Sequence, residues 1–405
     1  MVNMKKLKKI FSKRMLFFLI DNIKSMIAFI ISKMINTKYK NSWIICERKD
    51  EARDNGYHLY KFIINNCPVR NVFYIINKNS YDIDKIRKIS KNIIYFGTIK
   101  HWIALYSADA LISTHINGYI PNELVYKYTS KLLKIKGKKV FLQHGIIKDN
   151  LPQLYYEKTK LNLFICGAYP EYQYIKKKFN YPQKVVKYTG LCRFDNLKIS
   201  EIKRQILVMP TFRIDFFVHP DEIISNSKME YFKNSEYYKQ YNSLLNDKEL
   251  NEILKQQNVT IIFYPHYEMQ RYISCFNNSK LSNILIAKSN EKDIQELLKE
   301  SSLLITDFSS VFFDFAYMKK PMIYFQFDYN EYRNKHYLEG YFSYKDNGFG
   351  PVIVNYEKLK STIIHYVIND FIMEKKYKNR VNSFFKFQDC NNCKRNYDEI
   401  RRIVK

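Results

Sequence analysis

The sequence predicts an α/β protein in which two doubly wound, parallel-sheet domains face each other across a cleft. Short apolar runs, rich in branched and aromatic residues, alternate with helical stretches along the chain, which is the pattern of βαβ units. The alternation occurs in residues 40–189 and again in residues 190–380, so the second half repeats the design of the first. With 405 residues, the chain is long enough for both domains.

The first domain, residues 40–189, is predicted to be a doubly wound, Rossmann-like sheet with helices between its strands. Each predicted strand is a short apolar run, and polar loops separate strands from helices. The predicted strands are 43–46, 72–76, 93–96, 110–113, 139–142, 163–166 and 185–188, and the predicted helices are 59–65, 82–90 and 98–107.

The second domain, residues 190–380, is centred on residues 301–328, which predict a strand, a polar turn, a helix and a second strand. Residues 215–247 are polar and are expected to form a surface insertion that is partly helical. Residues 381–405 are expected to form a C-terminal helical segment that packs back across the domains. The predicted strands are 206–209, 260–263, 284–286, 303–305 and 321–327, and the predicted helices are 291–300 and 311–318.

Ser309 and Ser310 lie in the polar turn of this second domain, at the start of the predicted helix 311–318. The carboxyl edge of a parallel sheet is where α/β proteins bind ligands. Backbone N–H groups at a helix start favour an anion, and the serine hydroxyls add donors. The same serines would also serve as a simple helix cap. On this motif alone, the helix cap is the favoured interpretation, and anion binding remains open.

Two histidines follow predicted strands at the same edges of their sheets. His144 follows the strand 139–142 and precedes Gly145, where the backbone can turn sharply or a ligand can approach closely. His266 follows the strand 260–263. A histidine suits proton transfer near neutral pH. The alternative, a buried histidine bonded to a carbonyl group, remains open. The predicted architecture places both histidines at the cleft.

Composition limits the partners and the cofactors. The chain has 67 Lys and Arg against 39 Asp and Glu, and the net charge of +28 favours nucleotide phosphates, a polyanionic polymer, an anionic membrane surface or nucleic acid. Nucleic acid is disfavoured because no helix-turn-helix, zinc-finger or aromatic RNA-binding motif occurs. The seven cysteines are scattered, and Cys390 and Cys393 form a lone CxxC without the second pair that a zinc site needs. The sequence therefore predicts no metal site and no required cofactor; Mg²⁺ remains open, and the sequence does not indicate it.

Residues 1–39 predict a basic, amphipathic, membrane-associating segment of one or two helices. The apolar runs 15–20 and 26–31 are too short to span a bilayer, and polar residues interrupt them. The alternative is a helix packed on its own domain. The residues expected to contact lipid headgroups are Lys5, Lys6, Lys8, Lys9, Lys13 and Arg14, and those expected to enter the interface are Ile10, Phe11, Leu16 and Phe17.

Six motifs in order resemble the CDP-glycerol glycerophosphotransferase family, the teichoic acid and capsule polymerases, and the resemblance covers about residues 43–397. Each motif alone is weak, but the ordered set is specific. The chain departs from the family where Gln143 and Cys192 stand in place of a frequent Trp and Pro, which bears on the acceptor and on initiation. The motifs are Asp54-Asn55-Gly56-Tyr57, Gln143-His144-Gly145, residues 190–195, Pro210-Thr211-Phe212-Arg213, Pro265-His266 and residues 305–314.

The resemblance implies a GT-B-type fold, a peripheral location on the cytoplasmic face of the membrane, and transfer of a polyol phosphate with release of CMP. The implied donor is CDP-glycerol or CDP-ribitol, and the implied acceptor is a lipid-linked or polymer chain. His144 would be the general base on the acceptor hydroxyl, and His266 would contact the donor phosphates. The implied donor-binding residues are Arg193, Arg213, Thr306, Asp307, Ser309 and Ser310.

Phosphoryl transfer needs positioning and charge stabilisation more than covalent chemistry, and a helix start, two arginines and a histidine can supply both without a metal. Asp307, which precedes the serines and can cap or orient the turn, and Asp314, one turn into the helix 311–318, are expected to be structural rather than catalytic. A nucleotide-sugar glycosyltransferase on the same fold is the alternative function, because fold does not determine function.

Overall fold

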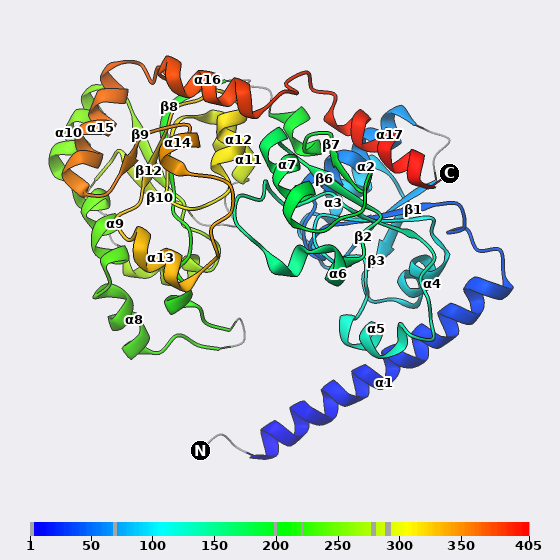
Figure 1. The fold of residues 1–405 in the computed structure, drawn as a ribbon. Helices are drawn as coiled ribbons and strands as arrows, with labels where there is room; N and C mark the ends of the chain where they lie inside the picture. The colour runs from blue at the N-terminus through cyan, green and yellow to red at the C-terminus, as the bar shows by residue number, and fades with distance from the viewer. Residues whose placement is uncertain are drawn as a thin grey trace. The chain divides into compact units, whose positions relative to one another are not determined.

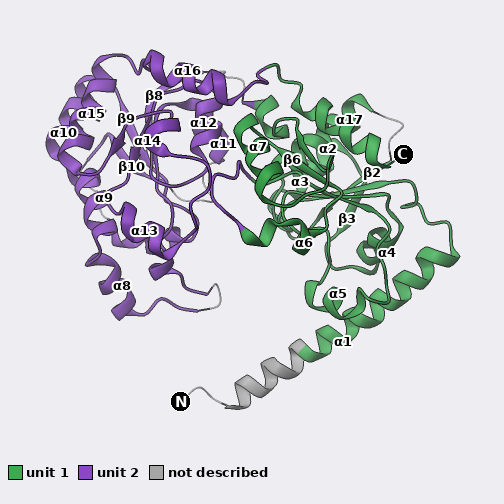
Figure 2. Ribbon diagram, in the orientation of Figure 1, with its two compact units in different colours: residues 1–144, 152–196, 389–405 green, residues 145–151, 197–388 purple. Residues whose placement is uncertain are grey.

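The computed structural model describes residues 4–67, 71–197, 201–219, 222–276, 281–287 and 293–404, with side chains from residue 15 onward. The chain divides into two compact units (Figure 2). Unit 1 comprises residues 1–144, 152–196 and 389–405, and unit 2 comprises residues 145–151 and 197–388. The predicted domain boundary lies between residues 189 and 190, whereas the main division between the units lies between residues 196 and 197. In addition, the short segment 145–151 belongs to unit 2, and the C-terminal residues 389–405 belong to unit 1.

Unit 1 is built on a seven-stranded parallel sheet in the order β3-β2-β1-β4-β5-β6-β7 (Figure 1). The strand order reverses between β1 and β4, and such a switch point is where doubly wound sheets bind ligands. Every strand lies within one residue of its predicted range. The elements are α1 (Met4–Met34), β1 (Trp43–Cys46), α2 (Asn55–Asn66), β2 (Val72–Ile76), α3 (Ile83–Ile89), β3 (Ile93–Tyr95), α4 (Ile99–Ser107), β4 (Ala110–Ser113), α5 (Glu123–Thr129), β5 (Lys138–Phe141), α6 (Tyr156–Thr159), β6 (Leu163–Cys166), α7 (Tyr169–Lys178), β7 (Val186–Tyr188) and α17 (Asn392–Val404), with the 3-10 turns η1 (Pro152–Leu154) and η2 (Cys192–Asn196).

Alternate side chains of these strands enter two separate cores. Trp43 and Ile45 of β1 pack with α2 and α17 on one face of the sheet, whereas Ile44 and Cys46 pack with α1, α4 and α5 on the other. The strands are therefore buried on both faces, as parallel strands between helical layers are. Helix α17 brings the end of the chain back to unit 1, where the ring centroid of Tyr397 lies 5.4 Å from that of Trp43.

Unit 2 contains a six-stranded parallel sheet in the order β10-β9-β8-β11-β12-β13, with its switch point between β8 and β11 (Figure 1). Much of the predicted surface insertion folds into helices that contribute to the hydrophobic core on one face of this sheet. The elements are β8 (Lys203–Met209), η3 (Ile214–Phe216), α8 (Asn226–Lys233), α9 (Glu236–Asn246), α10 (Lys248–Gln256), β9 (Thr260–Phe263), η4 (Met269–Cys275), β10 (Ile284–Ile286), α11 (Ile294–Glu300), β11 (Ser301–Thr306), α12 (Phe312–Tyr317), β12 (Met322–Phe325), α13 (Tyr329–Lys335), α14 (Tyr344–Asn347), β13 (Val352–Ile353), α15 (Tyr356–Ile368) and α16 (Lys375–Phe384).

The N-terminal segment forms one helix, α1, which lies along α4 (Figure 1). Two of its polar residues contact the rest of unit 1: the Ser25 hydroxyl lies 2.7 Å from the Tyr106 hydroxyl, and Asp21 accepts a hydrogen bond from Asn122. By length and composition, Met15–Met34 suffices to cross a bilayer, although core helices and signal sequences meet the same test. The apolar runs 15–20 and 26–31 are each predicted to be too short to span a bilayer, whereas α1 joins them into one helix that is long enough to do so.

The outward side of α1 is apolar. The exposed large apolar side chains on the described part of this helix are Met15, Leu16, Phe17, Leu19, Ile20, Ile23, Met26, Ile27, Ile30 and Met34. The side chains predicted to contact lipid headgroups, Lys5, Lys6, Lys8, Lys9, Lys13 and Arg14, lie outside the described residues, as do those of Ile10 and Phe11.

Candidate active site

The predicted site residues gather in two clusters, one in each unit, at the carboxyl ends of the strands. In unit 1, His144 follows β5, next to the strands that flank the switch point. In unit 2, Arg213 follows β8, His266 follows β9, and Asp307 follows β11. Both clusters therefore occupy the edge at which doubly wound sheets bind ligands.

The imidazole of His144 is oriented by a carboxylate. Its Nδ1 lies 2.7 Å from Oδ2 of Asp54, which is the N-cap residue of α2. The His144 side chain is 58% exposed, so the ring remains accessible to a ligand. When Nδ1–H donates to the carboxylate, Nε2 carries the lone pair and can accept a proton. The pair thus has the geometry that a general base requires.

Arg193 contacts both His144 and Asp54 and so links the two residues. Its Nη1 donates to Asp54 Oδ1 at 2.7 Å and to the backbone oxygen of His144 at 2.6 Å. Burial raises the pKa of Asp54, but the charges of Arg193 and His144 outweigh it, and the pKa lies below its ordinary value. The buried Asn55 bridges the same segments, because its Nδ2 donates to Gln143 O at 2.8 Å and its Oδ1 accepts from Arg193 N at 3.0 Å.

The turn that presents His144 has an unusual backbone conformation. Gln143 takes a left-handed conformation with φ of 65°, which costs a non-glycine residue roughly 1–2 kcal/mol. Hydrogen bonds hold it there: its carbonyl accepts from Asn55, and its side-chain Nε2 donates to Ile165 O at 2.5 Å. Strain of this kind persists where the surroundings enforce it, which is common at functional sites.

His115 has no predicted role, but it packs beside His144. It follows β4, its ring centroid lies 5.1 Å from that of His144, and its Nδ1 lies 2.9 Å from the Thr114 hydroxyl oxygen. Burial, and next the charge of His144, lowers the pKa of His115 to about 4. A neutral ring therefore stands next to His144. The available signal was its position after a strand at the switch point.

Glu47 is a second residue that sequence reasoning missed. It follows β1, is buried, and accepts backbone N–H groups of Arg53, Asp54 and Tyr57 at the start of α2. Burial and the neighbouring charge of Asp54 raise the pKa of Glu47 to about 8. A Cβ on Gly56 would lie 3.0 Å from Glu47 Cγ, which explains the glycine in this motif. Glu47 thus fixes the turn that places Asp54.

In unit 2, Arg213 is held between two carboxylates. Its Nη2 lies 2.9 Å from Asp307 Oδ2 and its Nε lies 2.7 Å from Asp328 Oδ2, and only 5% of the residue is exposed. The rings of Phe308 and Tyr332 lie 5.2 and 5.1 Å from the guanidinium carbon. Burial lowers the pKa of Arg213, but the two carboxylates outweigh it and raise the pKa above its ordinary value. Arg213 therefore stays charged and ties together the loops after β8, β11 and β12.

The turn after β11 combines buried and partly exposed residues. Thr306 is buried and its hydroxyl donates to Met209 O at 2.7 Å, while Asp307 Oδ1 accepts from Thr211 N at 2.8 Å. Ser309 and Ser310 are half-buried, and Ser309 Oγ accepts weakly from Val311 N at 3.4 Å. The first two residues shape the turn, and the two serines are the ones that a ligand can reach.

His266 is half-buried and stacks near an aromatic side chain. Its ring centroid lies 5.0 Å from that of Phe212, and Phe212 lies 5.4 Å from the ring of His336. The backbone N–H of His266 donates to Pro210 O at 3.2 Å. The loops after β8 and β9 are thereby joined, so His266 lies beside the loop that carries Arg213.

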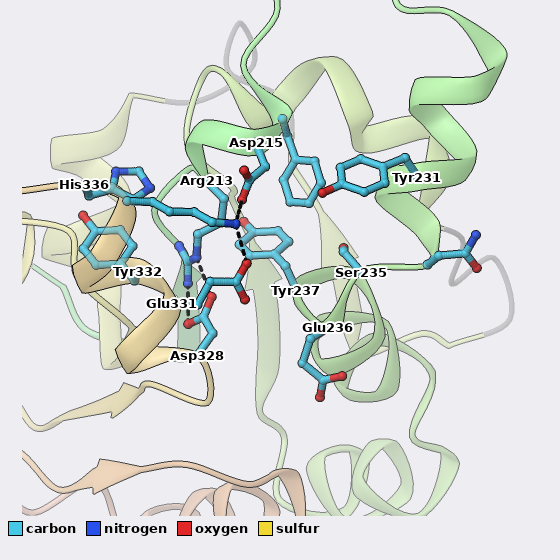
Figure 3. A pocket seen from close by; sticks show the side chains of 13 residues that line it. Arg213, Asp215, Tyr231, Ser235, Glu236, Tyr237, Asp328, Glu331, Tyr332 and His336 are labelled. Carbon is cyan, nitrogen blue, oxygen red and sulfur yellow. Dashed lines mark hydrogen bonds and ion pairs between the residues drawn. The ribbon is translucent and has the colours of Figure 1, made fainter.

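A cavity of about 190 Å³ lies beside Arg213 (Figure 3). Its walls include Asp215, Tyr237, Asp328 and His336. Arg213 is the sole member of the predicted site among the residues that line it. Within the described ranges, no group of three or more His, Cys, Asp or Glu side chains could hold a metal ion.

Similarities to known proteins agree with the predicted family. A profile of the CDP-glycerol:poly(glycerophosphate) glycerophosphotransferase family matches residues 26–402. The minor teichoic acid biosynthesis protein GgaB of Bacillus subtilis (strain 168) is 38% identical over 372 residues, which cover 90% of this chain and 40% of GgaB. A teichoic acid poly(glycerol phosphate) polymerase of Bacillus spizizenii is 26% identical over 308 residues, 70% of each chain. The chain thus spans less than half the length of GgaB.

Solved structures agree in fold. The wall teichoic acid polymerase TagF matches with a TM-score of 0.68 at 16% identity, covering 99% of this chain and 96% of that chain. UDP-GlcNAc 2-epimerase from Neisseria meningitidis matches with a TM-score of 0.52 at 10% identity, covering 89% and 99%. These likenesses confirm the predicted pair of parallel-sheet α/β domains. With the profile match, the predicted resemblance and the prediction of an enzyme of this kind are confirmed: the chain belongs to the CDP-glycerol:poly(glycerophosphate) glycerophosphotransferase family.

Proposed function

We propose that this chain transfers glycerol phosphate from CDP-glycerol to the terminal hydroxyl of a growing teichoic-acid-like or capsular polymer. The observation that carries the proposal is the Asp54–His144 pair at the ligand-binding edge of unit 1. The family description names CDP-glycerol. CDP-ribitol is the second donor to consider, because a Bacillus spizizenii relative is named a poly(ribitol-phosphate) polymerase.

In the proposed reaction, the oxygen of the acceptor hydroxyl attacks the β-phosphorus of the donor, and Nε2 of His144 takes the proton of that hydroxyl. A new O–P bond forms, the bond from that phosphorus to the bridging oxygen breaks, and CMP leaves. Asp54, 2.7 Å from Nδ1, stabilises the imidazolium that results. A positioned base of this kind typically contributes about 10²–10⁴-fold.

The donor phosphates are proposed to bind in unit 2, at His266, Ser309 and Ser310, which are all half-buried. Backbone N–H groups and hydroxyls at such a turn suit phosphate oxygens. The contacts of Arg193 and Arg213 with carboxylates of their own units support positioning roles for these arginines. Nothing in this mechanism requires a metal, so we expect CMP release to persist in EDTA.

We also propose that α1 holds the protein peripherally on the cytoplasmic face of the membrane. Its exposed side chains are mostly large and apolar, while Asp21 and Ser25 contact the rest of unit 1. An apolar helix face of this kind can insert at the boundary between headgroups and acyl chains. The net charge of +28 favours a membrane that contains anionic lipid. The acceptor would then be a lipid-linked polymer presented at the same surface.

The proposed function is tested by offering CDP-glycerol, CDP-ribitol and UDP-sugars separately, with a glycerol-phosphate-primed acceptor, and measuring CMP or UDP. We expect CMP from CDP-glycerol. His144→Ala should remove this activity, whereas His365→Ala, which changes an exposed histidine on α15, should keep it. UDP release without CMP release would favour the glycosyltransferase alternative.

A further inference from the structure

The chain crosses from unit 1 to unit 2 directly after His144. Residues 145–151, here called the strap, belong to unit 2, and the chain returns to unit 1 at Pro152. The residue proposed as the base is therefore the last residue of unit 1 before the crossing. Its backbone is continuous with seven residues that pack as part of the other unit.

On the unit 1 side, His144 is held at two points. Its ring is fixed by Asp54, and its carbonyl oxygen accepts from Arg193 Nη1 at 2.6 Å. The carbonyl belongs to the peptide bond that leads into the strap. Any displacement of the strap is therefore applied to the same peptide group that Arg193 holds.

On the unit 2 side, the strap is anchored by a backbone bridge and by buried charges. Asn150 pairs antiparallel with Leu338, and its N–H donates to the Leu338 carbonyl at 2.9 Å. Asp149 Oδ1 accepts from Arg333 Nη1 at 2.6 Å, although the two residues are 184 positions apart in the sequence. The ammonium of Lys148 contacts the other carboxylate oxygen of Asp149. The side chains of these three charged residues are each about nine-tenths buried.

The strap also packs too closely for an ordinary loop. A Cβ on Gly340 would lie 2.3 Å from the carbonyl oxygen of Lys148 and 2.9 Å from the carbonyl carbon of Asp149. Ile146 and Ile147 are both less than one-tenth exposed. Loops usually run over the surface and vary freely, whereas this segment is fixed along most of its length.

We propose that Asp149 and Arg333 position the base His144 through the strap, so that the unit with the proposed donor-binding residues also sets where the base lies. The inference rests on the proposed function of His144. Arg333 acts from a distance, as a positioning residue. Because a misplacement of about 1 Å can cost as much as about 10²-fold in rate, loosening the anchor should lower turnover without weakening donor binding.

The central test replaces Arg333 with Gln. The fold should survive, since Asp149 keeps Lys148 as a partner. We expect kcat at saturating CDP-glycerol to fall about tenfold or more, with the donor KM nearly unchanged and partial rescue in Arg333→Lys. The matched control is Arg204→Gln, which removes an arginine of unit 2 that pairs with Asp370 and does not contact the strap. Its kcat should equal that of the wild type.

A second variant keeps every charge and moves the strap by sterics alone. Gly340→Ala should force the carbonyl of Lys148 to shift, and kcat should fall as in Arg333→Gln. An unchanged kcat in folded Arg333→Gln and Gly340→Ala would overturn the proposal, as would an equal loss in Arg204→Gln.

A measurement without turnover separates this inference from the proposed function. Diethyl pyrocarbonate modifies accessible histidines, and peptide mass spectrometry gives the rate at His144. We expect a severalfold faster rate in Arg333→Gln than in the wild type and Arg204→Gln, because the contact with Asp54 loosens. Equal rates of His144 modification in Arg333→Gln and the wild type would refute the proposal that the strap positions His144. If the wild type releases no CMP from any donor, the proposed function fails, and this rate alone decides the inference.

Discussion

Replacing Asp54 with Asn tests how the base is oriented. Asn keeps the size of the side chain but removes the charge that His144 Nδ1 contacts at 2.7 Å and that Arg193 contacts at 2.7 Å. An Asn amide can donate to Nδ1, which moves the ring proton to Nε2 and blocks the position that should accept the hydroxyl proton. The variant therefore removes most of the contribution of the base, and we expect kcat to fall about 10²–10⁴-fold.

The assay is CMP release at saturating CDP-glycerol, with donor KM measured alongside. KM should change little, because the proposed donor contacts lie in unit 2 while Asp54 lies in unit 1. Stability should fall by about 1–3 kcal/mol, since Arg193 loses one partner but keeps the carbonyl of His144. Asp84→Asn is the matched control, because the Asp84 side chain is 75% exposed and forms an ion pair with Arg87 on the same helix.

Two outcomes would refute this reasoning. One is a folded Asp54→Asn enzyme that keeps nearly all of its kcat, which would mean that His144 needs no oriented tautomer. The other comes from the double variant with His144→Ala. Residues that act as one unit are not additive, so the double variant should be no slower than His144→Ala alone. A further large loss would show that Asp54 acts separately.

Three other predictions concern stability and membrane binding. Gly190 has φ of 81° and a Cβ there would lie 2.0 Å from Asn392 Oδ1, so Gly190→Ala should lower the melting temperature more than Gly97→Ala, where φ is 74° and no atom lies within 4 Å; equal losses would contradict this. Burial lowers the pKa of His101 to about 4, and its neutral ring donates to Tyr119 O at 3.0 Å. The unfolded chain binds a proton below pH about 6.5 while the folded chain resists it, so the free energy of unfolding should fall by on the order of 3 kcal/mol between pH 7 and 4. The urea midpoint of His101→Gln should change less with pH over this window than that of the wild type. The same dependence of the midpoint on pH in both proteins would contradict the lowered pKa of His101. Deletion of residues 1–39 should abolish co-sedimentation with anionic liposomes, and unchanged sedimentation would exclude α1 as the anchor.

The strands were predictable because each is a compact signal in the sequence. Branched and aromatic runs bounded by polar turns located β1 to β7 within one residue. The edge positions of His144 and His266 followed from the strands, since a residue directly after a parallel strand must lie at the carboxyl edge. Local pattern therefore predicted where the site would be found.

The partners of the site residues were not predictable, because they depend on contacts between distant segments. Arg193 reaches Asp54, 139 positions away, and Arg333 reaches Asp149, 184 positions away. A motif shows that an arginine is present, but it does not show whether a phosphate or a carboxylate will hold it. The unit to which the strap belongs was equally hidden, since it depends on Asp149 and Leu338 rather than on its own sequence.

The most direct test of the central claim is the product formed from CDP-glycerol and a glycerol-phosphate-primed acceptor, read by mass spectrometry together with released CMP. The account predicts an acceptor lengthened by whole glycerol phosphate units, one CMP for each unit, and loss of both in His144→Ala. An acceptor of unchanged mass, or equal CMP release by wild type and a folded His144→Ala, would contradict it.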